Sequence, residues 1–464
     1  MKTRILLSAS ALALVAGTAA SIAMDYRGGN SAFGDWHGDT PGLMRKIEAG
    51  DVAKPGATPS AANRSKVVPR PADAQIKTMP GFTVSDFATG LEGARVIRIA
   101  PNGDVFVSQS MPSGSVTVLR PSKDGKVESK ETFVTGLTRA YGIAFYPPGP
   151  NPKYVYIGME GKVVRLPYKN GDMKATGPAE DIVTDLKIGG GHWTRDVSFT
   201  PDGKLMYVAV GSGSNIAEEM SPRPADLKAW EKAPHSLGST WGAKEEWRAN
   251  VLTYTPDGKN KQVYAAGIRN CSGLTVQPGT GTVFCATNER DLLGDNTPPD
   301  YVTSVKKGGY YGWPWYYIGA NEDTRPDGGA RPDLKGKAIV PDVLLQPHSA
   351  PLGLSFNPGG MFPAEWKGDA FVAMHGSWNR SLHTGYKIVR LPFKNNKATG
   401  EYQDFVLGFT APSGEENVWG RPVDTQFMHD GSLLFSDDAN GVIYRVTYSK
   451  DKVAAAEDTG AKKN

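Results

Sequence analysis

The feature that most constrains this chain is a unit that recurs along it. Each copy has an alternating apolar run, a turn rich in Pro, Asn, Asp and Gly, and a second apolar run. Copies occur at residues 96–110, 142–158, 196–211, 273–288, 353–376 and 424–438. Six similar units of short strands predict an all-β fold, a six-bladed β-propeller with long loops on the active-site face. A pair of β-sandwiches would also explain the strands, but not the repeated unit.

Composition agrees with many short strands joined by turns. The 464 residues include 55 Gly and 34 Pro, and 39% of the residues are hydrophobic, which is enough for a globular core. The formal net charge is +4 and no block of Lys or Arg occurs, which argues against a nucleic-acid partner.

The two ends of the chain differ from the repeats. Residues 1–23 carry a basic start, a short apolar stretch and small residues, which predict a signal peptide and a periplasmic location; an uncleaved anchor is the alternative. No later stretch is apolar enough for a stable membrane span. Residues 24–75 predict an extended wrapping segment, 76–449 the propeller domain, and 450–464 a disordered tail.

Export would permit a disulfide between the two cysteines, Cys271 and Cys285. The expected hairpin pairs Cys285 with Leu274, which leaves Cys271 about 10 Å away along its strand. A disulfide needs about 4–7 Å between Cα atoms, so only a β-bulge would bring the two together. Whether they are bonded is left open. Two cysteines without a CxxCH motif exclude a c-type haem.

Polar residues stand just before the first strand of one repeat after another. In a propeller these positions converge at one mouth of the central channel. A ring of such groups would suit a polyanionic ligand, and a histidine among them is a candidate acid or base; alternatively, each pairs with a neighbouring blade. The positions are occupied by Arg139, His192, Arg269 with Asn270, His348 and Arg421.

Other loops contain further candidates. Hard oxygen ligands in the irregular stretch 286–301 suit Ca²⁺, although acidic loops are usually only solvated. The stretch VAVGSGSN, residues 208–215, lacks the third glycine of a dinucleotide-binding loop, and no βαβ unit follows it. The loop HGSWNRSLHTG, residues 375–385, adds polar and aromatic groups. The candidates in these loops are Glu289, Asp291, Asp295, Asp300, His375, Trp378, Asn379, Arg380 and His383.

Six stretches together resemble the glucose/sorbosone dehydrogenase family, in its sorbosone dehydrogenase-like branch. They are GGGHWTRDVSFTPDG, GIRNCSGLTV, TNERD, GGYYGWP, AMHGSWNR and VWGRP, and the likeness covers roughly residues 80–447. The resemblance implies a six-bladed propeller that binds pyrroloquinoline quinone (PQQ) and Ca²⁺ and oxidises sugars. PQQ is a flat tricarboxylate, which suits a cationic mouth.

The resemblance assigns roles to individual residues. His192 matches the catalytic base, and Arg269 with Asn270 matches the pair at the reactive edge of PQQ, where Arg269 would stabilise negative charge. Arg421 matches an arginine that binds a PQQ carboxylate. The usual PQQ-binding lysine has no clean match, and Asn379 or Arg380 is expected to take its place.

The resemblance also implies metal sites and shows departures. Backbone carbonyls near Glu289 and Arg290 match the catalytic Ca²⁺ site, and Asp300 with the Tyr311 carbonyl matches a structural one. The second arginine of the family's pattern is replaced by Val423, and the acidic residue before the catalytic histidine is replaced by Gly191, so the family's sugar contacts at these two positions are absent here.

The sequence therefore predicts PQQ-dependent oxidation of an aldose or a sorbosone-like sugar aldehyde, with hydride transfer to the quinone and an external electron acceptor. Two alternatives are kept: a Ca²⁺-dependent lactonase, and a non-catalytic propeller that binds carbohydrate.

Overall fold

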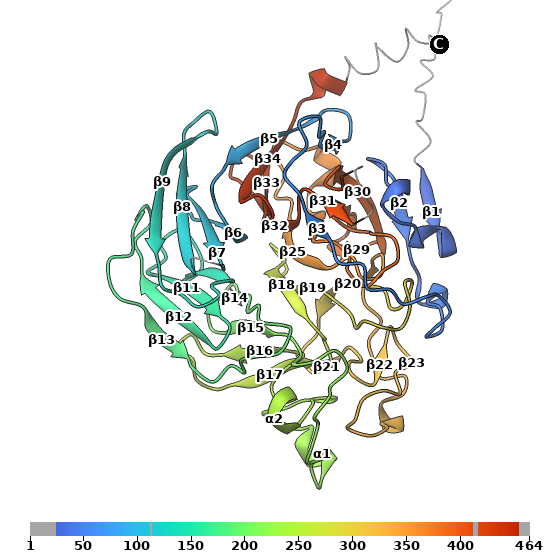
Figure 1. Cartoon of the computed structure of the whole chain (residues 1–464). Coiled ribbons are helices and arrows are strands. Elements are labelled where there is room, and N and C mark those ends of the chain that lie inside the picture. Colours follow the sequence, from blue (N-terminus) through green and yellow to red (C-terminus); the bar gives the residue numbers. More distant parts are fainter. Residues whose placement is uncertain (1–24, 112–113, 412–415, 454–464) are drawn as a thin grey trace, which may run out of the picture.

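The computed structural model describes residues 25–111, 114–411 and 416–453. The predicted signal peptide and most of the predicted tail lie outside these ranges. Within them the protein is all-β, as expected, and the strands form a propeller arrangement around a common centre (Figure 1). No helix in these ranges is both long and apolar enough to cross a bilayer.

Hydrogen bonding divides the described strands into six sheets of at least four strands each. The sheets are β6–β9 (Ala94–Ile99, Val105–Gln109, Ser115–Pro121, Val127–Val134); β10–β13 (Ile143–Tyr146, Tyr154–Met159, Lys162–Pro167, Glu180–Val183); β14–β17 with β21 (Val197–Phe199, Met206–Val210, Asn250–Tyr254, Gln262–Ala266, Gly309–Tyr310); β18–β20 with β24 (Cys271–Val276, Val283–Thr287, Tyr301–Val305, Val343–Leu344); β25–β27 with β30, β1, β2 and β4 (Pro351–Phe356, Ala370–Met374, Lys387–Leu391, Glu401–Leu407, Tyr26–Gly28, Met44–Lys46, Lys77–Thr78); and β32–β34 with β5 (Pro422–Phe427, Leu433–Asp437, Val442–Tyr448, Phe82–Ala88).

The first strands of these sheets form a closed ring. β6 contacts β10, β10 contacts β14, and contacts continue through β18, β25 and β32 back to β6. The last sheet is completed by β5 from the other end of the domain, which pairs antiparallel with β34 from Ala88 opposite Ile443 to Phe82 opposite Tyr448. This pairing leaves no gap between the start and the end of the ring (Figure 1).

A hydrophobic core lies between each pair of neighbouring sheets, because strands buried on both faces carry apolar side chains on both. The core between the fifth and sixth sheets is aromatic: Phe371 and Phe405 pack 5.0 Å apart at an interplanar angle of 70°. Such edge-to-face pairs add to the burial of the rings.

An ion cluster joins three first strands across the centre of the ring. Arg98 on β6 donates to Asp424 on β32 at 2.8 Å and to both oxygens of Asp196, beside β14, at 3.1 Å. Both carboxylates also accept backbone N–H groups, Asp424 from Ile97 and Asp196 from Leu274. The pairs and the backbone bonds together satisfy these buried charges.

Smaller elements complete the structure. Three two-stranded ribbons and two single-turn helices lie in the loops: β3–β31 (Lys66–Val67, Asn417–Val418), β22–β23 (Tyr316–Tyr317, Asn321–Glu322), β28–β29 (Phe393–Lys394, Lys397–Ala398), α1 (Leu227–Trp230) and α2 (Gly242–Glu245). In the fourth sheet Cys285 pairs with Leu274, as expected, and a β-bulge between Cys271 and Gly273 shifts the register. The bulge brings the two cysteine Cα atoms to 5.4 Å, and the disulfide forms.

Candidate active site

The starts of the first strands surround a cavity of about 540 Å³. Polar residues at five of the six starts line it, which places groups from five sheets in one pocket. They are Arg95 at β6, His192 before β14, Arg269 and Asn270 before β18, His348 before β25 and Arg421 before β32. The loops between strands add Glu289, Asp291, Asp300, His375 and Trp378.

Seven residues named from the sequence do not line this cavity, Asp295 and His383 among them. Arg139 pairs with Glu160 at 3.0 Å, and the Tyr311 hydroxyl donates to the Ser304 carbonyl at 2.6 Å. The Asn379 amide donates to the Ala61 carbonyl at 2.7 Å. The side chains of Arg290 and Arg380 also point elsewhere: Arg290 donates to the carbonyls of Pro314 and Tyr316, and Arg380 to the carbonyl of Phe33.

His192 is held in one orientation and kept neutral. Its Nδ1 lies 3.0 Å from the carbonyl oxygen of Ser212, and because a carbonyl only accepts, Nδ1 carries the proton. Burial, together with the positive charge of Arg269, lowers the pKa of His192 to about 3. Nε2 therefore has a free lone pair at neutral pH, and it has no hydrogen-bond partner in the described part of the chain.

A glycine makes room for this histidine. A Cβ atom at Gly211 would lie 2.6 Å from the Cβ of His192 and 2.4 Å from Oδ1 of Asn270. Both distances are below any real contact, so a larger residue would displace the pocket residues. Gly211 belongs to the stretch that resembles a dinucleotide-binding loop, and here its lack of a side chain serves close packing behind the pocket.

Glu245 of α2 holds the loop that carries Ser212. It accepts hydrogen bonds from the backbone N–H of Gly213 at 2.8 Å and from the hydroxyl of Ser214 at 2.5 Å. Burial raises the pKa of Glu245 to about 7, although both hydrogen bonds favour its charged form.

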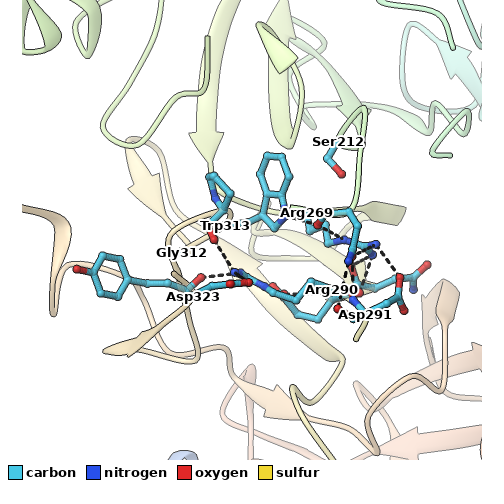
Figure 2. Close-up of polar contacts among 12 residues, drawn as sticks. Ser212, Arg269, Arg290, Asp291, Gly312, Trp313 and Asp323 are labelled. Carbon is cyan, nitrogen blue, oxygen red and sulfur yellow. Dashed lines mark hydrogen bonds and ion pairs between the residues drawn. The ribbon is translucent and has the colours of Figure 1, made fainter. Parts of the chain in front are cut away.

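The guanidinium of Arg269 is fully hydrogen-bonded. It pairs with Asp291 at 3.0 Å, donates to the side chain of Asn215 at 2.9 Å and donates to the carbonyl of Glu289 at 2.6 Å. Figure 2 shows Arg269 joined to Asp291, whereas Arg290 extends the other way, toward Asp323. Arg269 is thus a rigid positive charge beside His192.

A second chain of polar contacts joins Arg421 to Arg95. Arg421 donates to Nδ1 of His375 at 3.0 Å, and Nε2–H of His375 donates to Asp438 at 3.0 Å. Asp438 also pairs with Arg95 at 2.6 Å. Burial and the charge of Arg421 lower the pKa of His375 to about 4. Arg421 itself forms no salt bridge with any described residue, and Asp438, whose pKa its charge helps to lower, already pairs with Arg95.

The acidic groups of the pocket are engaged within the protein. Asp300 accepts the backbone N–H groups of Glu289 and Ala350, both at 2.8 Å, and burial raises its pKa to about 7. Asp291 is shared between Arg269 and His348, whose Nδ1 lies 3.7 Å away. Burial opposes protonation of His348, but the nearby Asp291 carboxylate outweighs it, so the pKa of His348 is raised.

The sequence predicts two calcium sites, one near Glu289 and Arg290 and one at Asp300 with the Tyr311 carbonyl, and each has one member in the pocket lining. Glu289 and Asp300 line the pocket, while Arg290 and Tyr311 do not. The Glu289 carbonyl accepts from Arg269, and Oε1 of Glu289 is buried without a partner. Within the described ranges, no group of three or more His, Cys, Asp and Glu side chains could hold a metal ion.

Some pocket residues were not identified from the sequence. Arg95 stands at the start of β6 and would have been found if the strand-entry rule had been applied to the first repeat. Ser212, Glu245 and Asp438 act through hydrogen bonds between distant segments, which no sequence signal reveals. Arg64 reaches the pocket from the N-terminal segment, whose path the sequence does not give.

The fold and the site define a β-propeller whose central pocket holds a neutral histidine among arginines. The family model described as TrAA12-like matches residues 76–302 and 331–449, most of the chain. The chain therefore belongs to the TrAA12-like family.

Two curated relatives match parts of the chain. An uncharacterized protein of Borreliella burgdorferi is 37% identical over 207 residues, which are 44% of this chain and 53% of that protein. A pyrroloquinoline quinone-dependent pyranose dehydrogenase of Coprinopsis cinerea is 29% identical over 171 residues, which are 32% of this chain and 20% of that protein. The chain spans about half of the first relative and a fifth of the second.

Solved structures share the fold over most of the chain. The holo PQQ domain of the Coprinopsis cinerea pyranose dehydrogenase has a TM-score of 0.63 and 21% identity, covering 82% of this chain and 98% of that domain. The PQQ-bound aldose sugar dehydrogenase of Streptomyces coelicolor has a TM-score of 0.53 and 18% identity, covering 82% of this chain and all of that one. The resemblance to PQQ-dependent sugar dehydrogenases that the sequence motifs indicated is confirmed.

Proposed function

We propose that this protein is a PQQ-dependent sugar dehydrogenase that oxidises an aldose or a sorbosone-like sugar aldehyde. One observation carries the proposal: His192 is neutral, fixed through Nδ1, and adjacent to Arg269 in a cationic pocket. A neutral imidazole with a free Nε2 can accept the proton of a sugar hydroxyl, and a fixed positive charge nearby can stabilise negative charge that develops on the ligand.

The pocket residues fit PQQ. A tricarboxylate needs cations, and Arg421 forms no salt bridge with a described carboxylate. Arg421 would bind one carboxylate of PQQ, and Arg269 with Asn270 would lie at its reactive edge. When bound, PQQ supplies the quinone that accepts the hydride from the sugar. Asn379 and Arg380 would join this set only after release from their contacts with Ala61 and Phe33.

His192 would take the hydroxyl proton at Nε2. In a pocket without a ligand, burial keeps the imidazole neutral, so the base is ready at neutral pH. The Ser212 carbonyl then stabilises the imidazolium, because Nδ1–H donates to it in both protonation states. Arg269 opposes that positive charge and would stabilise negative charge that develops nearby. Oxidation of the sugar would release two protons and two electrons in all; the protons would leave to solvent, and an external electron acceptor would take the two electrons.

Four further points belong to the same proposal. Calcium is proposed as a second cofactor near Glu289, supported by the unpartnered Oε1 of that residue, and Asp300 with Tyr311 as a second cation site. The six sheets in a closed ring support six blades. Export to the periplasm rests on residues 1–23 alone. The electron acceptor is small or macromolecular and reaches the pocket from outside.

Titration of the purified protein with PQQ, with and without Ca²⁺, tests the proposal. We expect saturable changes in quinone absorbance and, with an artificial acceptor, sugar-dependent turnover. His192→Ala should retain PQQ and lose at least about 100-fold in kcat, the usual contribution of a general base. Full activity in His192→Ala would refute the base assignment. Lactone hydrolysis without quinone would favour a lactonase instead, whose metal-binding acids are here engaged by Arg269 and backbone N–H groups.

A further inference from the structure

A segment outside the family match forms one wall of the pocket. Residues 56–68, which we call the strap, precede the matched region that starts at residue 76. β3 of the strap pairs with β31, as Figure 1 shows by the blue strand beside the orange one. The backbone of Gly56 donates to Leu293 at 2.8 Å, and Asn63 donates to Trp378 at 2.7 Å. The strap therefore connects three loops that surround the pocket.

Two polar side chains of the loop 375–385, those of Asn379 and His383, hold the strap and do not line the pocket. The amide of Asn379 donates to Ala61 at 2.7 Å, and His383 bonds the carbonyl of Asn63 at 2.9 Å through Nε2. The side chain of Asn63 returns a hydrogen bond to the Ser381 carbonyl at 3.0 Å. These contacts flank residue 64 on the chain and fix where its side chain starts.

Arg64 extends from the strap into the pocket lining. Its guanidinium lies over the indole of Trp378, 5.3 Å from the ring centroid, and Trp378 is 38% exposed. The ring limits the conformations of the guanidinium without neutralising it. Among described residues Arg64 has no salt bridge, whereas Arg95 pairs with Asp438 and Arg269 pairs with Asp291.

Exposure separates Arg64 from the arginines that suit the cofactor. Arg269 and Arg95 are buried, at 4% and 9% exposure, while Arg64 is exposed. A cofactor bound among the buried arginines would leave Arg64 free at the pocket rim, where it could contact the sugar substrate. A planar, preorganised guanidinium recognises a carboxylate or phosphate in a bidentate manner.

We propose that Arg64, positioned by Trp378, forms a rim subsite for the acidic group of an anionic sugar, a uronic acid or a sugar phosphate. This inference rests on the proposed function and names its substrate class. It also gives the N-terminal segment a role: the strap supplies a specificity-determining residue that the matched propeller domain does not contain.

The test compares glucuronate and glucose 6-phosphate with glucose, using protein loaded with PQQ. Arg64→Gln should reduce the ratio of kcat/KM for at least one acidic sugar to that for glucose by about tenfold or more, the effect of losing one charge-assisted contact. The sugar affected identifies the acidic group. Lys66→Gln is the matched control, because it removes the same charge from the strap at a side chain outside the pocket lining, and it should leave the ratio unchanged. An unchanged ratio in Arg64→Gln, or one that falls equally in Lys66→Gln, would overturn the proposal.

Two further readouts separate this subsite from the proposed function. Calorimetric binding of glucuronate and glucose 6-phosphate needs no turnover, so Arg64-dependent binding in a protein that oxidises nothing would retain the subsite and reject the dehydrogenase. If the protein oxidises glucose but Arg64→Gln changes neither the binding nor the oxidation of any acidic sugar, the dehydrogenase function is retained and the subsite is rejected. A loss of PQQ affinity in Arg64→Gln with unchanged sugar selectivity would assign Arg64 to the cofactor and overturn the subsite.

Discussion

The neutral state of His192 predicts a specific pH dependence of stability. Its pKa in the folded protein is about 3, while the pKa of a histidine in the unfolded chain is about 6.5. Between these values the unfolded chain binds a proton that the folded protein does not. The free energy of unfolding therefore falls as the pH falls below about 6.5, and this continues down to about 3.

The magnitude follows from that difference. Between about pH 7 and about pH 5 the contribution of this one histidine to the free energy of unfolding falls by about 2 kcal/mol. Other ionisable groups, such as Asp300 and Glu245 with their raised pKa values, also titrate in this range. They are present in wild type and variant alike, so they cancel in the difference between the two proteins.

Urea unfolding of wild type, His192→Gln and His192→Asn at several pH values measures this difference. Each variant should gain about 2 kcal/mol relative to wild type on going from about pH 7 to about pH 5, whatever its offset at neutral pH. Gln and Asn differ in size, so a packing change at residue 192 would affect the two variants differently. Loss of the titrating group instead gives both variants the same change with pH in the free energy of unfolding relative to wild type. Parallel stability curves for wild type and variants would refute the reasoning.

Two other substitutions test how the pocket and its supporting sheet are built. Gly211→Ala places a methyl group 2.6 Å from Cβ of His192, so kcat of the PQQ-loaded protein should fall by about 100-fold, the effect of misplacing a catalytic group by about 1 Å. Gly50→Ala is the control, because nothing lies within 4 Å of its new Cβ. Equal kcat values for the two variants would contradict the packing argument. Cys271→Ser removes a disulfide between residues 14 positions apart and should lower the free energy of unfolding by about 3 kcal/mol through loop entropy. The loss should appear as a lower Tm than wild type when both are measured without reductant. Identical Tm values would show that the disulfide does not constrain the unfolded chain.

The strands and the pocket could be predicted for the same reason. Alternating apolar runs record which residues face neighbouring sheets, and the turns record where each strand begins. Because the first strands of the sheets converge, the residues that precede them in the sequence also lie close together in space. His192, Arg269 and Arg421 precede different strands in the sequence, yet all three line one cavity.

What the sequence could not supply was contact between segments outside the repeat. The side chain of Asn379 was expected near the cofactor, but it binds the strap, because nothing local indicates that residue 61 lies next to residue 379. The disulfide depended on a one-residue bulge at Cys271, which changes the register by an amount that periodicity does not record. The role of Glu245 likewise depends on a loop fold that has no repeat to compare.

The charge pairing of the arginines explains how one pocket can serve several tasks. A cation paired with a buried carboxylate, as Arg269 is with Asp291, is held in place and acts through its field on neighbours such as His192. A cation without such a partner, as Arg421 is among the described residues, instead offers its charge to a ligand. The same reasoning applies to Arg64, which an aromatic ring holds without cancelling its charge. On the proposed function, ligand specificity in this pocket depends on which arginines lack carboxylate partners, and less on how many arginines line it.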